Sequence, residues 1–135
     1  LTNEFATPTL SVQHRIDSDL PPLGPDVELV LYRVAQEGLT NVVRHARATN
    51  AHLVLRRVPD GVRLRIVDDG RGIGGAAEGA GISGMRERAL LVGAKLHIGP
   101  AGRCHPDDDA DLDLGITPGG GTEVCLTVPV RQGSH

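Results

Sequence analysis

The sequence predicts an α/β fold, a two-layer sandwich in which a mixed five-stranded sheet carries about three helices. The order of the predicted elements is the main reason: strand, helix, two strands, loop, helix and two strands. The length agrees, because 135 residues are enough for one domain with a modest core and too few for two. We therefore expect residues 1–135 to form a single domain. Because the first residue is leucine and not methionine, we also expect this domain to be a fragment of a longer chain.

Each element has its own periodicity. Apolar residues at steps of three and four predict a helix of about twenty residues that follows a cap at Asp26. A shorter helix is predicted at 85–92, with Gly93 as its C-terminal stop. Strand patterns lie at 9–17, 52–58, 62–67, 95–98 and 123–130. In the last strand, Cys125 is out of phase with its apolar neighbours.

Composition excludes several classes of function. One Phe, one Tyr and no Trp disfavour sites built on stacked aromatic rings. A net charge of −3 gives no footprint for a phosphate backbone, so we expect no nucleic-acid partner. No apolar run approaches the roughly 20 residues of a membrane span, so we expect no direct membrane contact. The two cysteines, Cys104 and Cys125, make no disulfide framework, which favours a reducing cytoplasmic setting and leaves open whether they pair.

The long helix carries a polar patch. Glu37 and Asn41 are four residues apart and share a face, and Arg44 and His45 follow near the end of the pattern. A carboxylate, a carboxamide, a guanidinium and an imidazole together could hold a hydrated metal ion and phosphates. The alternative is a solvated helix end, where Arg44 and His45 interact with the helix dipole.

A second motif follows the strand at 62–67. Asp68 and Asp69 lead into Gly70, Arg71 and Gly72, and the glycines would let a ligand approach the backbone closely. A buried Asp68 could accept a hydrogen bond from the exocyclic amine of an adenine. The alternative is an ordinary Asp-Gly turn.

A third motif, with Gly79, Gly81 and Gly84, matches the pattern G-x-G-x-x-G. It is not a dinucleotide-binding fingerprint, because no strand immediately precedes it and no acidic residue ends the next strand. The pattern also lacks the G-K-[ST] of a P-loop. What remains is a glycine-rich approach to a helix at Met85, whose free N–H groups could bind phosphate.

An acidic stretch at 101–118 contains Cys104, His105 and five aspartates. Its spacing does not match a calcium loop. We interpret it as a solvated insertion, with a Cys/His/Asp metal site as the alternative.

In this order and spacing, the motifs resemble those of the ATP-binding superfamily of gyrase-type topoisomerases, heat-shock chaperones and histidine kinases, the Bergerat fold. The nearest likeness is to the catalytic domain of sensor histidine kinases of the nitrate-sensor and desaturase-sensor type. Residues 32–46 resemble the N box, 67–73 the G1 box and 79–89 the G2 box, and 119–122 match the element before the final strand.

The resemblance implies a role for each matching position. Asn41 would ligate the Mg²⁺ that bridges the ATP phosphates, and Glu37 would order a metal-bound water or support a proton transfer. Asp68 would bind the adenine amine, supported by Thr122. Residues 72–84 would form the ATP lid. The remaining ATP-binding positions would be Arg44, His45, Gly70, Gly72, Gly79, Gly81, Gly84 and Met85.

The implied function is transfer of the γ-phosphoryl group of Mg-ATP to a histidine on a separate dimerisation domain, for relay to a response regulator. The resemblance implies a cytoplasmic domain, whether or not the parent protein is membrane-anchored. None of the six histidines lies in the context of a phosphoacceptor, so we do not expect this chain to autophosphorylate alone. The alternatives are an anti-sigma-factor serine kinase of the same fold and a non-catalytic nucleotide-sensing module.

Overall fold

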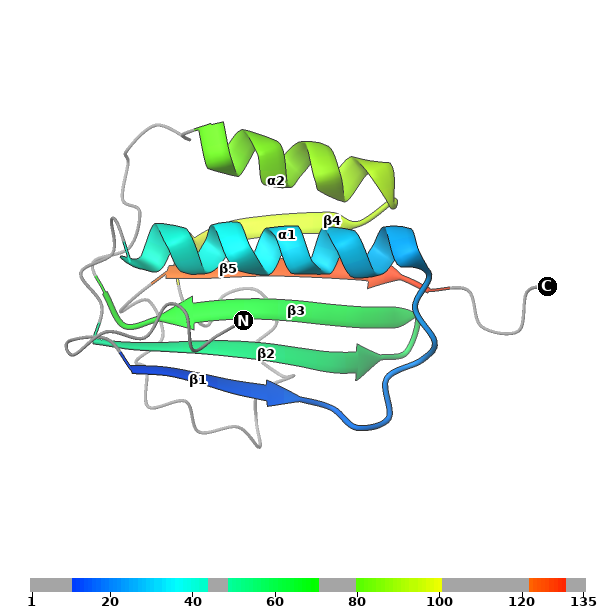
Figure 1. Cartoon of the computed structure of the whole chain (residues 1–135), viewed down its shortest axis with the longest axis horizontal. Helices are drawn as coiled ribbons and strands as arrows, with labels where there is room; N and C mark the ends of the chain where they lie inside the picture. The colour runs from blue at the N-terminus through cyan, green and yellow to red at the C-terminus, as the bar shows by residue number, and fades with distance from the viewer. Residues whose placement is uncertain (1–10, 44–48, 71–79, 101–121, 131–135) are drawn as a thin grey trace.

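The computed structural model describes residues 11–43, 49–70, 80–100 and 122–130. The element order matches the order predicted from the sequence (Figure 1). A mixed five-stranded sheet is confirmed, and two helices lie in the described part of the chain where about three were predicted. The elements are β1 (Ser11–Ile16), α1 (Pro25–Asn41), β2 (Asn50–Val58), β3 (Gly61–Asp68), α2 (Ala80–Leu91), β4 (Lys95–Pro100) and β5 (Thr122–Pro129).

The strands lie in the order β1-β2-β3-β5-β4. Only β1 and β2 are parallel, and the other pairs are antiparallel. A tight turn joins β2 to β3, where a side chain at Gly61 would overlap the carbonyl oxygen of Val128 on β5. The strand order places β3 in the centre of the sheet, where it is hydrogen-bonded to β2 on one side and to β5 on the other.

Both helices pack on one face of the sheet, and the hydrophobic core lies between the two layers. Alternate residues of the central strands point into that core, which follows from the two-residue period of a strand. At Gly38, α1 comes so close to β3 that an added Cβ would lie 2.5 Å from Cδ1 of Ile66. The largest contributors are Val30, Leu31, Val34 and Leu39 of α1, Met85 of α2, Val62, Leu64 and Ile66 of β3, and Val124, Leu126 and Val128 of β5.

The two helices begin earlier than the sequence predicted. Gly24, and not Asp26, is the N-cap of α1; Pro25 takes the first helical position, where its fixed φ suits a helix, and Asp26 lies in the first turn. The second helix begins at Ala80 and therefore includes Gly81 and Gly84. Glycine costs about 1 kcal/mol in a helix. Burial of Met85 and Ala89, which are 0% and 3% exposed, outweighs that cost.

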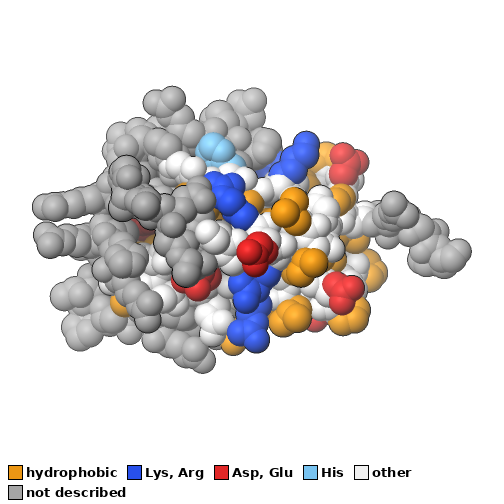
Figure 2. Space-filling model, turned by 90° about the horizontal axis from the view of Figure 1, so that it is seen from above, with side chains coloured by type: hydrophobic (Ala, Val, Ile, Leu, Met, Phe, Trp, Pro, Cys, Tyr) orange, Lys and Arg blue, Asp and Glu red, His pale blue; other side chains and the backbone are white. Residues whose placement is uncertain are grey.

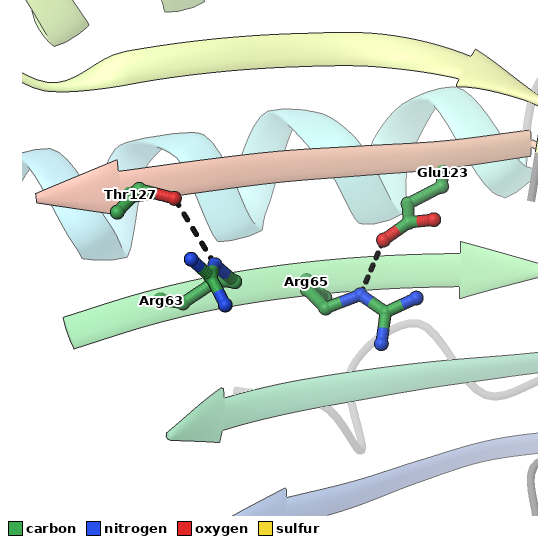
Figure 3. Close-up of polar contacts among 4 residues, drawn as sticks. All are labelled: Arg63, Arg65, Glu123 and Thr127. Carbon is green, nitrogen blue, oxygen red and sulfur yellow. Dashed lines mark hydrogen bonds and ion pairs between the residues drawn. The ribbon is translucent and has the colours of Figure 1, made fainter. Parts of the chain in front are cut away.

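The other face of the sheet carries a buried polar cluster (Figure 3). Arg65 of β3 forms an ion pair with Glu123 of β5, and both side chains are almost fully buried. Nε of the half-buried Arg63 donates a hydrogen bond of 3.1 Å to Oγ1 of Thr127. Burial and the neighbouring Arg65 and Arg56 lower the pKa of Arg63.

Cys125 lies on that second face, as its phase in the strand predicted. Its side chain is buried and disulfide-bonded. Cys104 and the rest of the acidic stretch lie outside the described residues.

Apolar and charged side chains share the outer surface of the helical layer (Figure 2). Leu29 and Tyr32 of α1 are 56% and 46% exposed, and Leu90 and Leu91 at the end of α2 are 78% and 81% exposed. Within the described ranges, neither helix is long and apolar enough to cross a membrane.

The buried ion pair makes a test of stability. Arg65→Met alone leaves Glu123 buried opposite an apolar side chain, so we expect the free energy of unfolding to fall by about 3–5 kcal/mol. The double variant Arg65→Met/Glu123→Leu should recover most of that loss, because neither member of the pair is then left buried without its partner. Urea denaturation measures both values.

Arg63→Met is the matched control, since it removes a half-buried arginine that donates to a neutral hydroxyl group and leaves no buried carboxylate behind, and it should cost about 1–2 kcal/mol. A double variant as unstable as Arg65→Met would contradict this account.

Candidate nucleotide-binding site

A buried carboxylate lies at the end of the central strand. Asp68 is the last residue of β3 and pairs across the ladder with Thr122, the first residue of β5. Both are on the helix-facing side, in line with the core positions Ile66 and Val124. Asp68 is 2% exposed and Thr122 is 6% exposed. The structure thus brings together the two residues that the resemblance assigned to adenine.

The surroundings of Asp68 oppose its ionisation. Burial raises the pKa of its carboxyl, and the neighbouring charge of Asp69 adds to this effect. The N–H groups of Gly70 and Thr122 act in the opposite direction, and the Gly70 N–H donates to Oδ1 at 2.8 Å. Because this pKa is raised, ionisation of Asp68 lowers the free energy of unfolding as the pH rises towards and through that pKa. A ligand that donates a hydrogen bond to this carboxylate would offset the penalty.

The polar patch of α1 lies at the same end of the molecule. The C-terminal end of α1, the end of β3, the start of β5 and the start of α2 all gather there (Figure 1). Glu37 and Asn41 are both partly exposed, one helical turn apart. The close contact of Gly38 with Ile66 holds this turn of the helix against the strand that carries Asp68.

The oxygen atoms at this end suit a small hard cation. Mg²⁺ prefers oxygen ligands and keeps several of its waters, so it needs few side chains from the protein. The amide oxygen of Asn41 and the carboxylate of Glu37 are ligands of that kind. In the described ranges no group of three or more His, Cys, Asp or Glu residues could hold a metal ion, so a closed metal centre is absent from them.

The glycine-rich motif is described only in its second half. Gly81 and Gly84 are part of α2, and the side chain of Met85 is 0% exposed in the core, where it anchors the helix. Arg44, His45, Gly72 and Gly79 lie outside the described residues, as does the metal-site alternative at 101–118.

Asp69 makes contacts that no motif in the sequence indicated. Its Oδ1 accepts hydrogen bonds from the backbone N–H groups of Thr49 and Asn50, both at 2.9 Å. Its Oδ2 accepts hydrogen bonds from Oγ1 of Thr49 at 2.9 Å and from Nδ2 of Asn50 at 3.0 Å. These partners are 19 and 20 residues away in the chain, so no local pattern could have indicated them.

These contacts decide the charge of Asp69. Burial works against ionisation, but the hydrogen bonds from Asn50 and Thr49 outweigh it and lower the pKa of Asp69 to about 2. The stabilisation is therefore present above the ordinary pKa of about 3.9 and is lost as the pH falls towards 2. At neutral pH, Asp69 is a fully charged clamp beside the buried Asp68.

Comparison with known proteins identifies the family of the chain. The family model for histidine kinase-, DNA gyrase B- and HSP90-like ATPases matches residues 26–132. An uncharacterized sensor-like histidine kinase of Chloroflexus aurantiacus is 34% identical in an alignment of 129 positions that covers 92% of this chain and 20% of that protein. The chain thus spans about a fifth of the length of this relative.

Solved structures share the fold. The blue-light activated histidine kinase of Erythrobacter litoralis superposes with a TM-score of 0.72 at 20% identity, covering 98% of this chain and 42% of that one. The ATP binding domain of PrrB from Mycobacterium tuberculosis gives a TM-score of 0.61 at 20% identity, covering 93% and 84%. With a family model that spans most of its length, the chain belongs to the histidine kinase-, DNA gyrase B- and HSP90-like ATPases, a family with an ATP-binding fold.

Proposed function

We propose that this chain is the catalytic, ATP-binding domain of a two-component sensor histidine kinase. It binds Mg-ATP and donates the γ-phosphoryl group to a histidine on a separate dimerisation domain, for relay to a response regulator. The motifs in its N, G1 and G2 boxes favour the nitrate-sensor and desaturase-sensor type, acting in the cytoplasm. The histidine kinase from Chloroflexus aurantiacus supports the kinase class.

The observation that carries the proposal is the buried pair of Asp68 and Thr122 at the sheet end where α1 and α2 also meet. A carboxylate that is buried and hard to ionise recognises a hydrogen-bond donor well, because both groups are removed from water. The exocyclic amine of adenine is such a donor. With one Tyr, one Phe and no Trp in the chain, we expect aliphatic walls and Asp68 to hold the base without ring stacking.

The phosphates would lie towards α1. Asn41 would ligate Mg²⁺, and Glu37, one turn earlier, would orient a water of the ion or accept a proton. When bound, Mg²⁺ neutralises charge on the phosphates, so the transfer depends on positioning and electrostatics. Arg44 and His45 would face the phosphates, and residues 72–84 would close over them as the lid.

We expect the phosphoacceptor histidine on another domain. His14, His52 and His97 lie in β1, β2 and β4, as predicted, and none of them is on a helix. The exposed apolar side chains of α1 and α2, Leu29, Tyr32, Leu90 and Leu91, provide a surface of the kind used in protein–protein contacts. Such a surface supports contact with a partner domain.

Removing the adenine-binding carboxylate should weaken ATP binding. For Asp68→Ala we expect a loss of about 1–3 kcal/mol, or about 5- to 150-fold in affinity, because the adenine amine loses its buried acceptor. Isothermal calorimetry with ATP measures this loss. Asp60→Ala is the matched control: it makes the same change in the exposed turn at the opposite end of β3 and should bind ATP as the wild type does. Unchanged affinity in Asp68→Ala would refute the assignment.

Removing the proposed metal ligand should uncouple nucleotide binding from Mg²⁺. We expect Asn41→Ala to bind ATP equally with and without Mg²⁺, whereas the wild type binds more tightly with it. Titrations with magnesium and with a chelator give the ratio of the two affinities. Gln36→Ala removes another amide from α1 and should keep the wild-type ratio. A magnesium dependence that survives in Asn41→Ala would place the metal elsewhere.

Phosphotransfer itself needs a reconstituted system. We expect labelled ATP, this chain and the dimerisation domain of the parent kinase to give acid-labile phosphohistidine on that domain, and this chain alone to give none. Asp68→Ala is the negative control. Acid-stable phosphoserine on a partner would indicate the anti-sigma-factor class instead, and nucleotide binding with no transfer to any acceptor would indicate a sensing module.

A further inference from the structure

Asp69 forms a clamp between two segments that are far apart in the chain. Its carboxylate accepts four hydrogen bonds from Thr49 and Asn50, with lengths of 2.9 to 3.0 Å. The backbone N–H of Asp69 also donates to the carbonyl oxygen of Asn50 at 3.1 Å. The two segments are thus joined by side chain and backbone together.

These bonds rule out a direct chemical role for the carboxylate. An ionised carboxylate offers about four lone-pair positions, and the clamp uses all four. No position remains for a metal ion or a substrate proton. The role of Asp69 is therefore to hold something else in place.

What the clamp holds follows from the positions of its partners. Asn50 is the first residue of β2, and Thr49 directly precedes that strand. Asp69 directly follows Asp68, and Asp68 pairs with Ala51 across the β2–β3 ladder. The hydrogen bonds between Asp69 and Asn50 extend that ladder by one residue beyond the buried Asp68. Asp69 also precedes Gly70, whose N–H donates to Asp68.

Without the Asp69 carboxylate, the chain after Asp68 would keep only two of these hydrogen bonds, from the Asp69 N–H to Asn50 and from the Gly70 N–H to Oδ1 of Asp68. The Thr122 N–H would still contact the Asp68 carboxylate, but the position of the Gly70 N–H, its second donor, would vary with the turn. Recognition of an amine by one acceptor depends on direction, because hydrogen bonds weaken steeply as they bend.

We propose that Asp69 is a positioning residue of the nucleotide site: by clamping Thr49 and Asn50 it fixes the direction of Asp68 and so sets the preference for adenine over guanine. This inference rests on the proposed function, because it takes Asp68 as the acceptor of the adenine amine. Guanine presents a carbonyl oxygen where adenine presents the amine, so a well-directed Asp68 carboxylate accepts from adenine and repels guanine.

The test compares ATP and GTP binding by calorimetry in four proteins: wild type, Asp69→Ala, Asp68→Ala and the double variant. We expect Asp69→Ala to bind ATP about tenfold more weakly, the size of one hydrogen bond to a charged group, while its GTP affinity changes little. The ratio of the two affinities therefore falls. A purely structural defect would lower both affinities together and leave the ratio unchanged.

The double variant separates positioning from an independent effect. If Asp69 acts through Asp68, adding Asp69→Ala to Asp68→Ala should cause no further loss of ATP affinity. Additive losses would overturn the proposal, as would a wild-type ratio of ATP to GTP affinity in Asp69→Ala.

Asp60→Ala serves again as the control for loss of an aspartate. Thr49→Val removes one exposed hydrogen bond of the clamp and should give a smaller fall in the ratio of ATP to GTP affinity. If Asp69→Ala fails to fold, Thr49→Val and Asn50→Ala decide the question.

The proposed function has its own point of failure in the same data. If Asp68→Ala binds ATP as well as the wild type does, the assignment of the adenine site fails whatever Asp69 does. If Asp68→Ala loses affinity and Asp69→Ala loses neither affinity nor preference, only the positioning role fails.

Discussion

The pairing of β3 with β5 is the contact on which the rest of the structure depends. These strands lie inside the sheet, and nearly all of their side chains are buried on both faces. On one face they carry the core against which α1 and α2 pack; on the other they carry the buried Arg65–Glu123 pair. Their register also aligns Asp68 with Thr122. A slip of one residue would move the apolar set to the wrong face and separate the site residues.

Two adjacent carboxylates at the end of β3 have opposite environments. Asp68 is buried with few hydrogen bonds, so its pKa is raised, whereas Asp69 is satisfied by Thr49 and Asn50, so its pKa is lowered. One residue therefore destabilises the folded site in its charged form while its neighbour stabilises it. Such a division is typical of a binding site. A buried group with a raised pKa, such as Asp68, can accept a hydrogen bond from a ligand, and a fully hydrogen-bonded group, such as Asp69, fixes the surrounding backbone.

The sequence predicted the types and order of the described elements because they depend on short-range periodicity. The strand alternation of β3 and the helical stripe of α1 are visible in any window of a few residues. The ends were less accurate for physical reasons. The start of α2 at Ala80 depends on the packing of Met85 and Ala89, which outweighs the unfavourable propensity of two glycines. The cap of α1 depends on Pro25 at its first position and not on the nearby aspartate.

The sequence by itself determined the family, because four boxes of residues in a given order are a linear property. It also singled out Asp68 and Thr122 from their places in the boxes. Only the tertiary structure decided that these two residues face each other across the β3–β5 ladder. The same holds for the ion pair of Glu123 with Arg65 on the other face of the sheet, and for the hydrogen bonds of Asp69 to the start of β2. Each of these contacts joins residues at least 19 positions apart, and strand register, not local sequence, brings them together.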